Sequence, residues 1–173
     1  MKKSCIPNIF TFINLSCGVF SIISIIKENF LLSAIFILIA GLVDRYDGRI
    51  ARYLQVSSEL GKELDSLADL VSFGVAPSIL IFTMFEMDNL APMGLLGYAL
   101  VIAFPICGAF RLARYNVSSF DGVYTGVPIT ITGCVLALFA IISLYTTKLL
   151  VVAIILMIVG AYLMVCTLKL KKR

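Results

Sequence analysis

Long apolar runs separated by short polar turns dominate the 173-residue chain. A helix that crosses a bilayer needs about 20 mostly apolar residues, and this criterion selects six runs, at 9–26, 31–52, 62–85, 91–114, 127–145 and 148–168. Lipid offers the backbone no hydrogen-bond partners, so each run is expected to be helical. The short connections leave no room for a further domain. The pattern therefore predicts an all-α integral membrane protein, with six transmembrane helices in a single domain over residues 1–173.

The composition supports a membrane protein. Hydrophobic residues make up 61% of the chain and charged residues 14%, against about 45–50% and about 25% in soluble domains. A soluble fold of this size cannot bury so much apolar surface, which excludes a water-soluble enzyme, a nucleic-acid-binding protein and a disordered chain. Polar residues interrupt the first run and no small-residue cleavage site follows it, which argues against a signal peptide. We expect a multi-pass protein of the cell membrane.

The basic residues indicate an orientation. Twelve of the fourteen Lys and Arg residues fall at one set of predicted helix ends, and only Lys27 and Lys148 fall at the other. Positive charge accumulates on the cytoplasmic side of membrane proteins. Both termini and the connections after the second and fourth runs are therefore expected in the cytoplasm.

Six of the ten acidic residues lie where the second run ends and the third begins. Charge at membrane depth is costly and usually functional. Helical periodicity puts on one face of the second helix Asp44, Asp47, Gly48, Ala51 and Arg52. The next helix presents in the same way Gly61, Asp65, Ala68, Asp69 and Ser72. A turn between the helices lets these faces meet, so we expect four carboxylates in one pocket lined by Gly and Ala.

Four ionised carboxylates within a few Å repel one another, and a divalent cation relieves this repulsion. Oxygen ligands in a chain without His favour Mg²⁺, Mn²⁺ or Ca²⁺. Two such ions, about 3.5–4 Å apart, suit phosphoryl transfer because they neutralise phosphate oxygens. Gly48 and Gly61 would let a phosphate approach the backbone, and Arg52 offers a planar guanidinium.

The residues alone leave two alternatives open. The charged residues are also compatible with a structural ion-pair cluster at a helix end, or with a proton or Na⁺ relay in an ion-coupled transporter. Against the transporter, the first, fifth and sixth runs carry no ionisable residue at mid-membrane depth. The acidic residues also lie near one face of the membrane, whereas alternating access places its sites near the midplane.

The pattern Asp44-x2-Asp47-Gly48-x2-Ala51-Arg52-x8-Gly61-x3-Asp65-x3-Asp69 resembles the complete signature of the CDP-alcohol phosphotransferase family. The resemblance implies an enzyme that transfers a phosphatidyl-type group from a CDP-linked lipid to an alcohol and releases CMP, with two divalent cations, Mg²⁺ or Mn²⁺. It implies that Asp44, Asp47 and Asp65 bind metal, and that Asp69 binds metal and also takes the proton of the alcohol. The residues bordering the cytidine diphosphate would be Gly48, Ala51, Arg52 and Gly61.

Asn8 and Thr11 lie one helical turn apart at the start of the first run, behind Pro7, which suits a helix start. Capping and packing by small polar groups would explain them. The family, however, commonly has a Pro-Asn-x-x-Thr element at this place. The resemblance therefore implies that Asn8 and Thr11 help to hold the nucleotide.

Arg111 and Arg114 lie in the segment RLARYN, and Gly126-Val127-Pro128 follows. Positive charge at a cytoplasmic helix end would explain both arginines, but guanidinium groups also bind carboxylates and phosphates. The stretch is similar to that of family members that use L-serine, although Val127 and Thr130 depart from the usual residues. We predict L-serine as the acceptor and a phosphatidylserine-type product; a phosphorylated acceptor, glycerol 3-phosphate or inositol phosphate, is the alternative.

The resemblance also implies a homodimer, since members of the family often form one. The apolar flanks of the third and fourth runs, including Phe73, Phe82 and Phe85, are the predicted contact with the second copy.

Overall fold

The structure is a computed structural model that describes residues 5–54, 59–90, 94–117, 123–146, 149–166 and 169–171. The described chain is almost entirely helical, as predicted, with the elements α1 (Cys5–Ile26), α2 (Phe30–Leu54), α3 (Glu59–Asp69), η1 (Leu70–Val75), α4 (Ala76–Met84), η2 (Met87–Asn89), α5 (Leu95–Val117), α6 (Ile129–Tyr145) and α7 (Leu150–Val165). Each apolar run predicted from sequence contains a helix. Two strands of three residues, which were not predicted, form an antiparallel pair: β1 (Val123–Thr125) and β2 (Lys169–Lys171).

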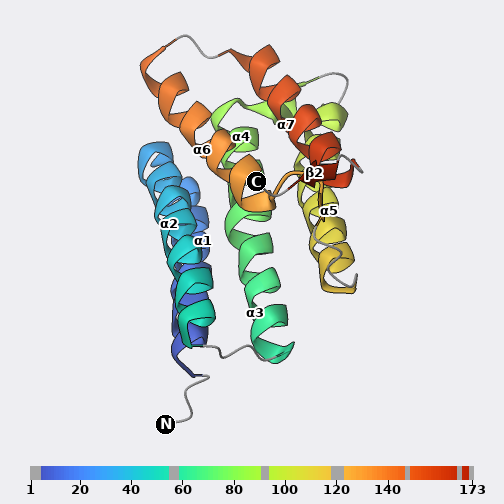
Figure 1. The fold of residues 1–173 in the computed structure, drawn as a ribbon. Helices are drawn as coiled ribbons and strands as arrows, with labels where there is room; N and C mark the ends of the chain where they lie inside the picture. Colours follow the sequence, from blue (N-terminus) through green and yellow to red (C-terminus); the bar gives the residue numbers. More distant parts are fainter. Residues whose placement is uncertain are drawn as a thin grey trace.

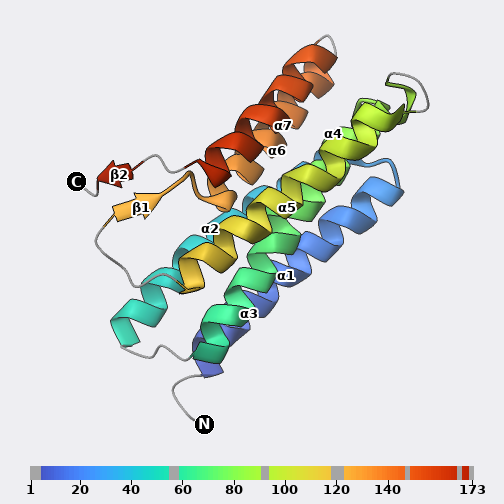
Figure 2. The same ribbon diagram turned by 90° about the vertical axis from the view of Figure 1, so that its right-hand side faces the viewer.

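The first two helices form an antiparallel hairpin (Figures 1 and 2). Glu28 turns the chain with a left-handed backbone (φ 57°), and the Asn29 side-chain oxygen accepts a hydrogen bond from the Leu32 N–H at 3.1 Å. This cap satisfies one of the free N–H groups at the start of α2. Further along, the buried hydroxyls of Ser21 and Ser33 hydrogen-bond across the two helices at 2.8 Å.

The central helix runs from Glu59 to Met84 but changes its winding in the middle. η1 is a π-helical segment, and the Ala76 N–H bonds to the Val71 carbonyl five residues earlier. Pro77 follows in the first turn of α4. Proline has no N–H to give to the carbonyl four residues earlier, which favours the wider turn over a regular α-helix. Isolated π turns are frequent at functional sites, and this one begins directly after Asp69.

Two glycines allow neighbouring helices to approach η1 closely. A Cβ on Gly18 of α1 would lie 2.5 Å from Ser72 Oγ, and one on Gly133 of α6 would lie 2.6 Å from the Phe73 carbonyl oxygen. Both contacts are shorter than a side chain tolerates. The segment that follows Asp69 is therefore held between α1 and α6.

The phenylalanines expected to contact a second copy have other roles. Phe73 is fully buried and Phe85 is 6% exposed, and Phe85 stacks on Phe139 of α6 with ring centroids 5.8 Å apart. The prediction that Phe73 and Phe85 form a dimer contact is wrong, because both side chains fill the core of the single chain. Phe82 is partly buried beside Tyr98.

Three helical stretches are long and apolar enough to cross a membrane among the described residues: Asn8–Ile26, Glu59–Met84 and Leu95–Val117. α6 and α7 are apolar but shorter, with 17 and 16 residues. α2 has the length, but its second half carries the charged motif. Large apolar side chains are exposed on the surface of α1, α5, α6 and α7, including Phe12, Ile106, Ile142 and Val151. These features support a membrane protein, while six spans and their orientation stay predictions.

Several helix ends near basic residues lie together. The start of α1, the C-terminal end of α2, the start of α3 and the C-terminal end of α5 lie at one end of the bundle in Figure 1. The α1–α2 turn and the end of α4 lie at the other end. α6 packs on α2 and α4, and α7 packs on α5.

Candidate active site

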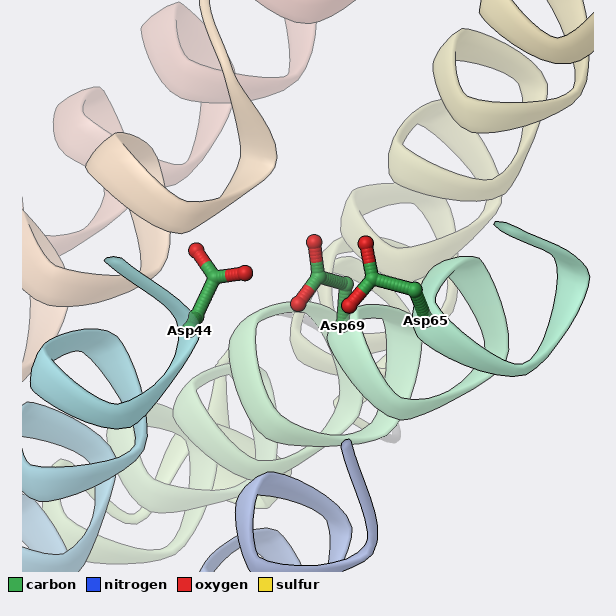
Figure 3. Close-up of side chains that lie close together, drawn as sticks. All are labelled: Asp44, Asp65 and Asp69. Carbon is green, nitrogen blue, oxygen red and sulfur yellow. The ribbon is translucent and has the colours of Figure 1, made fainter. Parts of the chain in front are cut away.

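Three of the four predicted aspartates converge between α2 and α3. Asp44 comes from the second half of α2, and Asp65 and Asp69 come from successive turns of α3 (Figure 3). One carboxylate oxygen of each residue lies within 4.8 Å of the other two. Asp69 is buried, and Asp44 and Asp65 are partly buried. The i, i+4 spacing puts Asp65 and Asp69 on one face of α3, and the packing of the helices turns this face toward Asp44.

The rest of the motif on α2 is described only in part. The backbone of residues 47–54 continues α2, but the side chains of Asp47, Gly48, Ala51 and Arg52 lie outside the described residues. Their roles stay predictions. Gly61, one turn before Asp65, is partly exposed on α3.

The three carboxylates fit a metal ion. Carboxylates this close, one of them buried, repel one another unless positive charge lies among them. Oxygen donors alone favour hard divalent cations such as Mg²⁺, Mn²⁺ or Ca²⁺. The cluster could therefore hold a divalent cation by Asp44, Asp65 and Asp69.

Asn14 of α1 also reaches this cluster, a contact that the sequence did not predict. Its side-chain Nδ2 donates a hydrogen bond to Asp69 Oδ1 at 3.0 Å, and Asn14 is 1% exposed. The feature of the sequence that could have indicated this contact is an amide side chain within an apolar run, one helical turn after Thr11. Thr11 is buried and Asn8 is partly exposed on the same helix, which packs along α3.

Thr130 is a second contact that was not predicted. It lies in the first turn of α6, and its hydroxyl donates a hydrogen bond to Asp44 Oδ2 at 3.4 Å. From sequence, Thr130 was only a departure from the usual residues after the Gly-Val-Pro turn. Besides α3, the cluster is thus formed and contacted by α1 through Asn14, α2 through Asp44 and α6 through Thr130.

The two arginines of α5 have different surroundings. Arg111 is 9% exposed and attracts Asp69 electrostatically. Its Nε has no hydrogen-bond partner among the described residues. A buried guanidinium with an unused donor beside the carboxylates is suited to binding an anionic group.

Arg114 instead binds the end of α7. Its guanidinium donates to the carbonyl oxygens of Val165 at 3.0 Å and Met164 at 3.5 Å. A cationic side chain that binds the last carbonyls of a helix stabilises the helix end. These contacts give Arg114 a structural role at the end of α7, whereas Arg111 interacts with Asp69.

The Gly-Val-Pro turn meets the same helix end. The Val127 N–H donates to the Leu163 carbonyl at 3.0 Å. Gly126 has a φ of 78°, and a Cβ there would lie 2.5 Å from the Met164 carbonyl oxygen. Only glycine suits both the backbone and the space. The turn thus places α6, with Thr130, against α7.

The fold and the site define an apolar helical protein with a partly buried carboxylate cluster that could hold a divalent cation. These are features expected of an integral membrane enzyme. A family model described as CDP-alcohol phosphatidyltransferase matches residues 4–168. The chain belongs to this family. The resemblance seen in the aspartate motif is thereby confirmed, and so is the prediction of a transferase.

Proteins similar to the chain carry the name CDP-diacylglycerol–serine O-phosphatidyltransferase. One from Bacillus subtilis (strain 168) is 35% identical over 134 residues, which is 77% of this chain and 73% of that protein. One from Helicobacter pylori (strain J99) is 36% identical over 126 residues, 71% of this chain and 52% of that protein. One from Methanocaldococcus jannaschii is 38% identical over 128 residues, 74% of this chain and 56% of that protein. The matches therefore span about half the length of the latter two relatives and nearly three quarters of the first.

Proposed function

We propose that this protein transfers a phosphatidyl group from CDP-diacylglycerol, or from an archaeal ether-lipid equivalent, to the hydroxyl of L-serine, which yields phosphatidylserine and CMP. The observation that carries the proposal is the convergence of Asp44, Asp65 and Asp69 within 4.8 Å in a chain of this family. The name shared by the relatives supports serine as the acceptor.

Asp44, Asp47, Asp65 and Asp69 would hold two divalent cations, Mg²⁺ or Mn²⁺. When bound, such ions neutralise the diphosphate oxygens and stabilise the leaving CMP. Burial of Asp69 and its hydrogen bond with Asn14 support a fixed carboxylate at this place.

In the proposed reaction, Asp69 takes the proton of the serine hydroxyl. The serine oxygen forms a bond to the lipid-side phosphorus, and the bond from that phosphorus to the oxygen bridging to CMP breaks. CMP leaves with the bonding electrons. A general base acts best when it is held within hydrogen-bond reach of the hydroxyl.

Binding of the two substrates would be divided between the helices. The donor nucleotide would contact the residues of the motif and of the start of α1: Asn8, Thr11, Gly48, Ala51, Arg52 and Gly61. Arg111 would bind the serine carboxylate through its free donor, which is supported by its burial beside Asp69. Arg114, also predicted at the acceptor site, would contribute by holding the end of α7.

We further propose a single domain with six passes through the cell membrane, both termini in the cytoplasm and the reaction at the cytoplasmic face. The twelve-to-two distribution of basic residues supports this orientation. A homodimer stays part of the proposal, with a contact that does not use Phe73 or Phe85.

Purified protein in detergent tests the proposal when it is given CDP-diacylglycerol and Mn²⁺, with L-serine, glycerol 3-phosphate, glycerol or inositol phosphate offered separately. We expect CMP release that depends on serine, together with phosphatidylserine identified by mass spectrometry. Release that depends on glycerol 3-phosphate or inositol phosphate would keep the reaction and replace the acceptor. No CMP release with any acceptor would contradict the proposed function.

A further inference from the structure

We propose that Asn14 is a positioning residue for the reaction, which orients the Asp69 carboxylate by holding its Oδ1. This inference rests on the proposed function. It assigns a role to a side chain that lies outside the aspartate motif and 55 positions before Asp69 in the sequence.

The contact is short and almost completely buried. Asn14 Nδ2 lies 3.0 Å from Asp69 Oδ1, and the two residues are 1% and 8% exposed. An amide N–H that donates to one carboxylate oxygen restricts rotation of the carboxylate. This bond fixes the Asp69 carboxylate at the place where it meets Asp44 and Asp65 (Figure 3).

Stability of the fold alone does not explain an asparagine at position 14. Its Oδ1 is buried and has no hydrogen-bond partner among the described residues. A buried acceptor without a partner lowers the stability of the fold. An apolar side chain at this position would avoid that cost. The hydrogen bond from Asn14 to Asp69 is therefore the feature that explains an asparagine here.

The backbone around Asn14 is also fixed against the central helix. Ser72 Oγ donates to the Asn14 carbonyl oxygen at 2.9 Å, and Gly18, one turn further along α1, leaves room for Ser72. Asp69 and Ser72 lie one turn apart at the junction of α3 and η1. Asn14 of α1 therefore contacts the central helix twice: its side chain bonds to Asp69, and its backbone carbonyl accepts from Ser72, one turn later. The second contact fixes the direction from which the amide approaches Asp69.

The decisive variant is Asn14→Leu, which has the same number and branching of side-chain heavy atoms as asparagine and no donor. The matched control is Ser21→Ala, which removes another buried interhelical hydrogen bond of α1, to Ser33, away from the carboxylates. Three quantities are measured for each protein: kcat and KM for both substrates from CMP release, the Mn²⁺ dissociation constant by electron paramagnetic resonance, and the midpoint of thermal unfolding.

We expect Asn14→Leu to lower kcat by about 10–100-fold and to weaken Mn²⁺ binding, as is typical when an outer contact to a metal ligand is lost. The KM for CDP-diacylglycerol should change by less than about threefold, because the donor contacts remain. Ser21→Ala should lower the unfolding midpoint but leave kcat and Mn²⁺ binding unchanged. A purely structural Asn14 would give the Ser21→Ala pattern, and that result would overturn the inference.

Two other results also have a defined interpretation: an Asn14→Leu variant that does not fold, and a wild type that releases no CMP. If Asn14→Leu does not fold, Asn14→Ser and Ser72→Ala replace it, and wild-type kcat and Mn²⁺ affinity in both would overturn the inference. If the wild type releases no CMP, the proposed function fails; weaker Mn²⁺ binding in the Asn14 variant would then still support orientation of Asp69, and unchanged binding would overturn it.

Discussion

Two groups of three acidic residues lie at different levels of the same bundle. Asp44, Asp65 and Asp69 converge within 4.8 Å, with Asp69 buried. The second group consists of Glu28, Glu86 and Asp88, which we call the loop acids. They are exposed and border an open cavity of about 370 Å³ at the α1–α2 turn and the end of α4.

The difference is in how the surrounding chain holds the carboxylates. Asn14 and Thr130 donate hydrogen bonds to Asp69 and Asp44, and all three aspartates belong to long helices. Glu28 and Glu86 lie in turns with left-handed backbones, φ 57° and 49°. Acidic residues in sequence therefore do not suffice for a site, and the distinguishing features are convergence, burial and neighbouring donors. The predictions below test this comparison.

Removal of divalent cations should have the largest effect. Excess EDTA should abolish CMP release by the purified protein, and added Mn²⁺ should restore it, because the aspartates otherwise repel the diphosphate. A Glu28→Gln variant should show the same Mn²⁺ dependence as the wild type. Full activity in excess EDTA would show that the carboxylates act without a metal.

Asp69→Asn should have the next largest effect. The amide has nearly the same shape but cannot take the proton of the acceptor hydroxyl, so kcat should fall by about 10²–10⁴-fold. Nucleotide binding should be partly retained, and equilibrium binding of CDP in the presence of Mn²⁺ checks this. Asp88→Asn is the matched change among the loop acids and should leave kcat unchanged. A kcat close to that of the wild type in Asp69→Asn would remove Asp69 as the base.

The fold was accessible from sequence to the extent that it depends on local patterns. Apolar runs predicted all the helices that carry the site, since a membrane requires helix wherever a run spans it. The i, i+4 spacing predicted that Asp65 and Asp69 share a face. The wider π turn was not predicted. Pro77 in the sequence indicates some departure from a regular helix, but a proline is equally compatible with a kink or a helix end.

The contacts that complete the site could not be predicted for a different reason. Asn14 and Asp69 are 55 positions apart, and Thr130 and Asp44 are 86 apart, so their meeting depends on how whole helices pack. Arg114 binds backbone carbonyls of α7, and a backbone carbonyl has no signature in the sequence. The structure thus separates two arginines that looked equivalent in the segment RLARYN.

That separation of the arginines gives the third prediction. Arg111→Ala should raise the KM for serine by about 10–100-fold, the loss expected for a charged hydrogen bond to a carboxylate, with little change in the KM for CDP-diacylglycerol. Arg114→Ala should mainly lower the unfolding midpoint, because the end of α7 loses its cap. Steady-state kinetics and thermal unfolding of both variants distinguish the roles. An unchanged serine KM in Arg111→Ala would count against serine binding at this arginine.

Thr130→Val should have the smallest effect. The substitution keeps the branched shape and removes the hydroxyl that donates to Asp44 at 3.4 Å. A single long, neutral donor contributes about 0.5–1.5 kcal/mol, so kcat should fall about 2–10-fold and Mn²⁺ binding should weaken slightly. Thr83→Val, beside the loop acids, is the matched change and should leave both quantities unaltered. If the two variants behave alike, the hydroxyl of Thr130 does not help to hold Asp44, and the aspartates depend on α1 and their own helices alone.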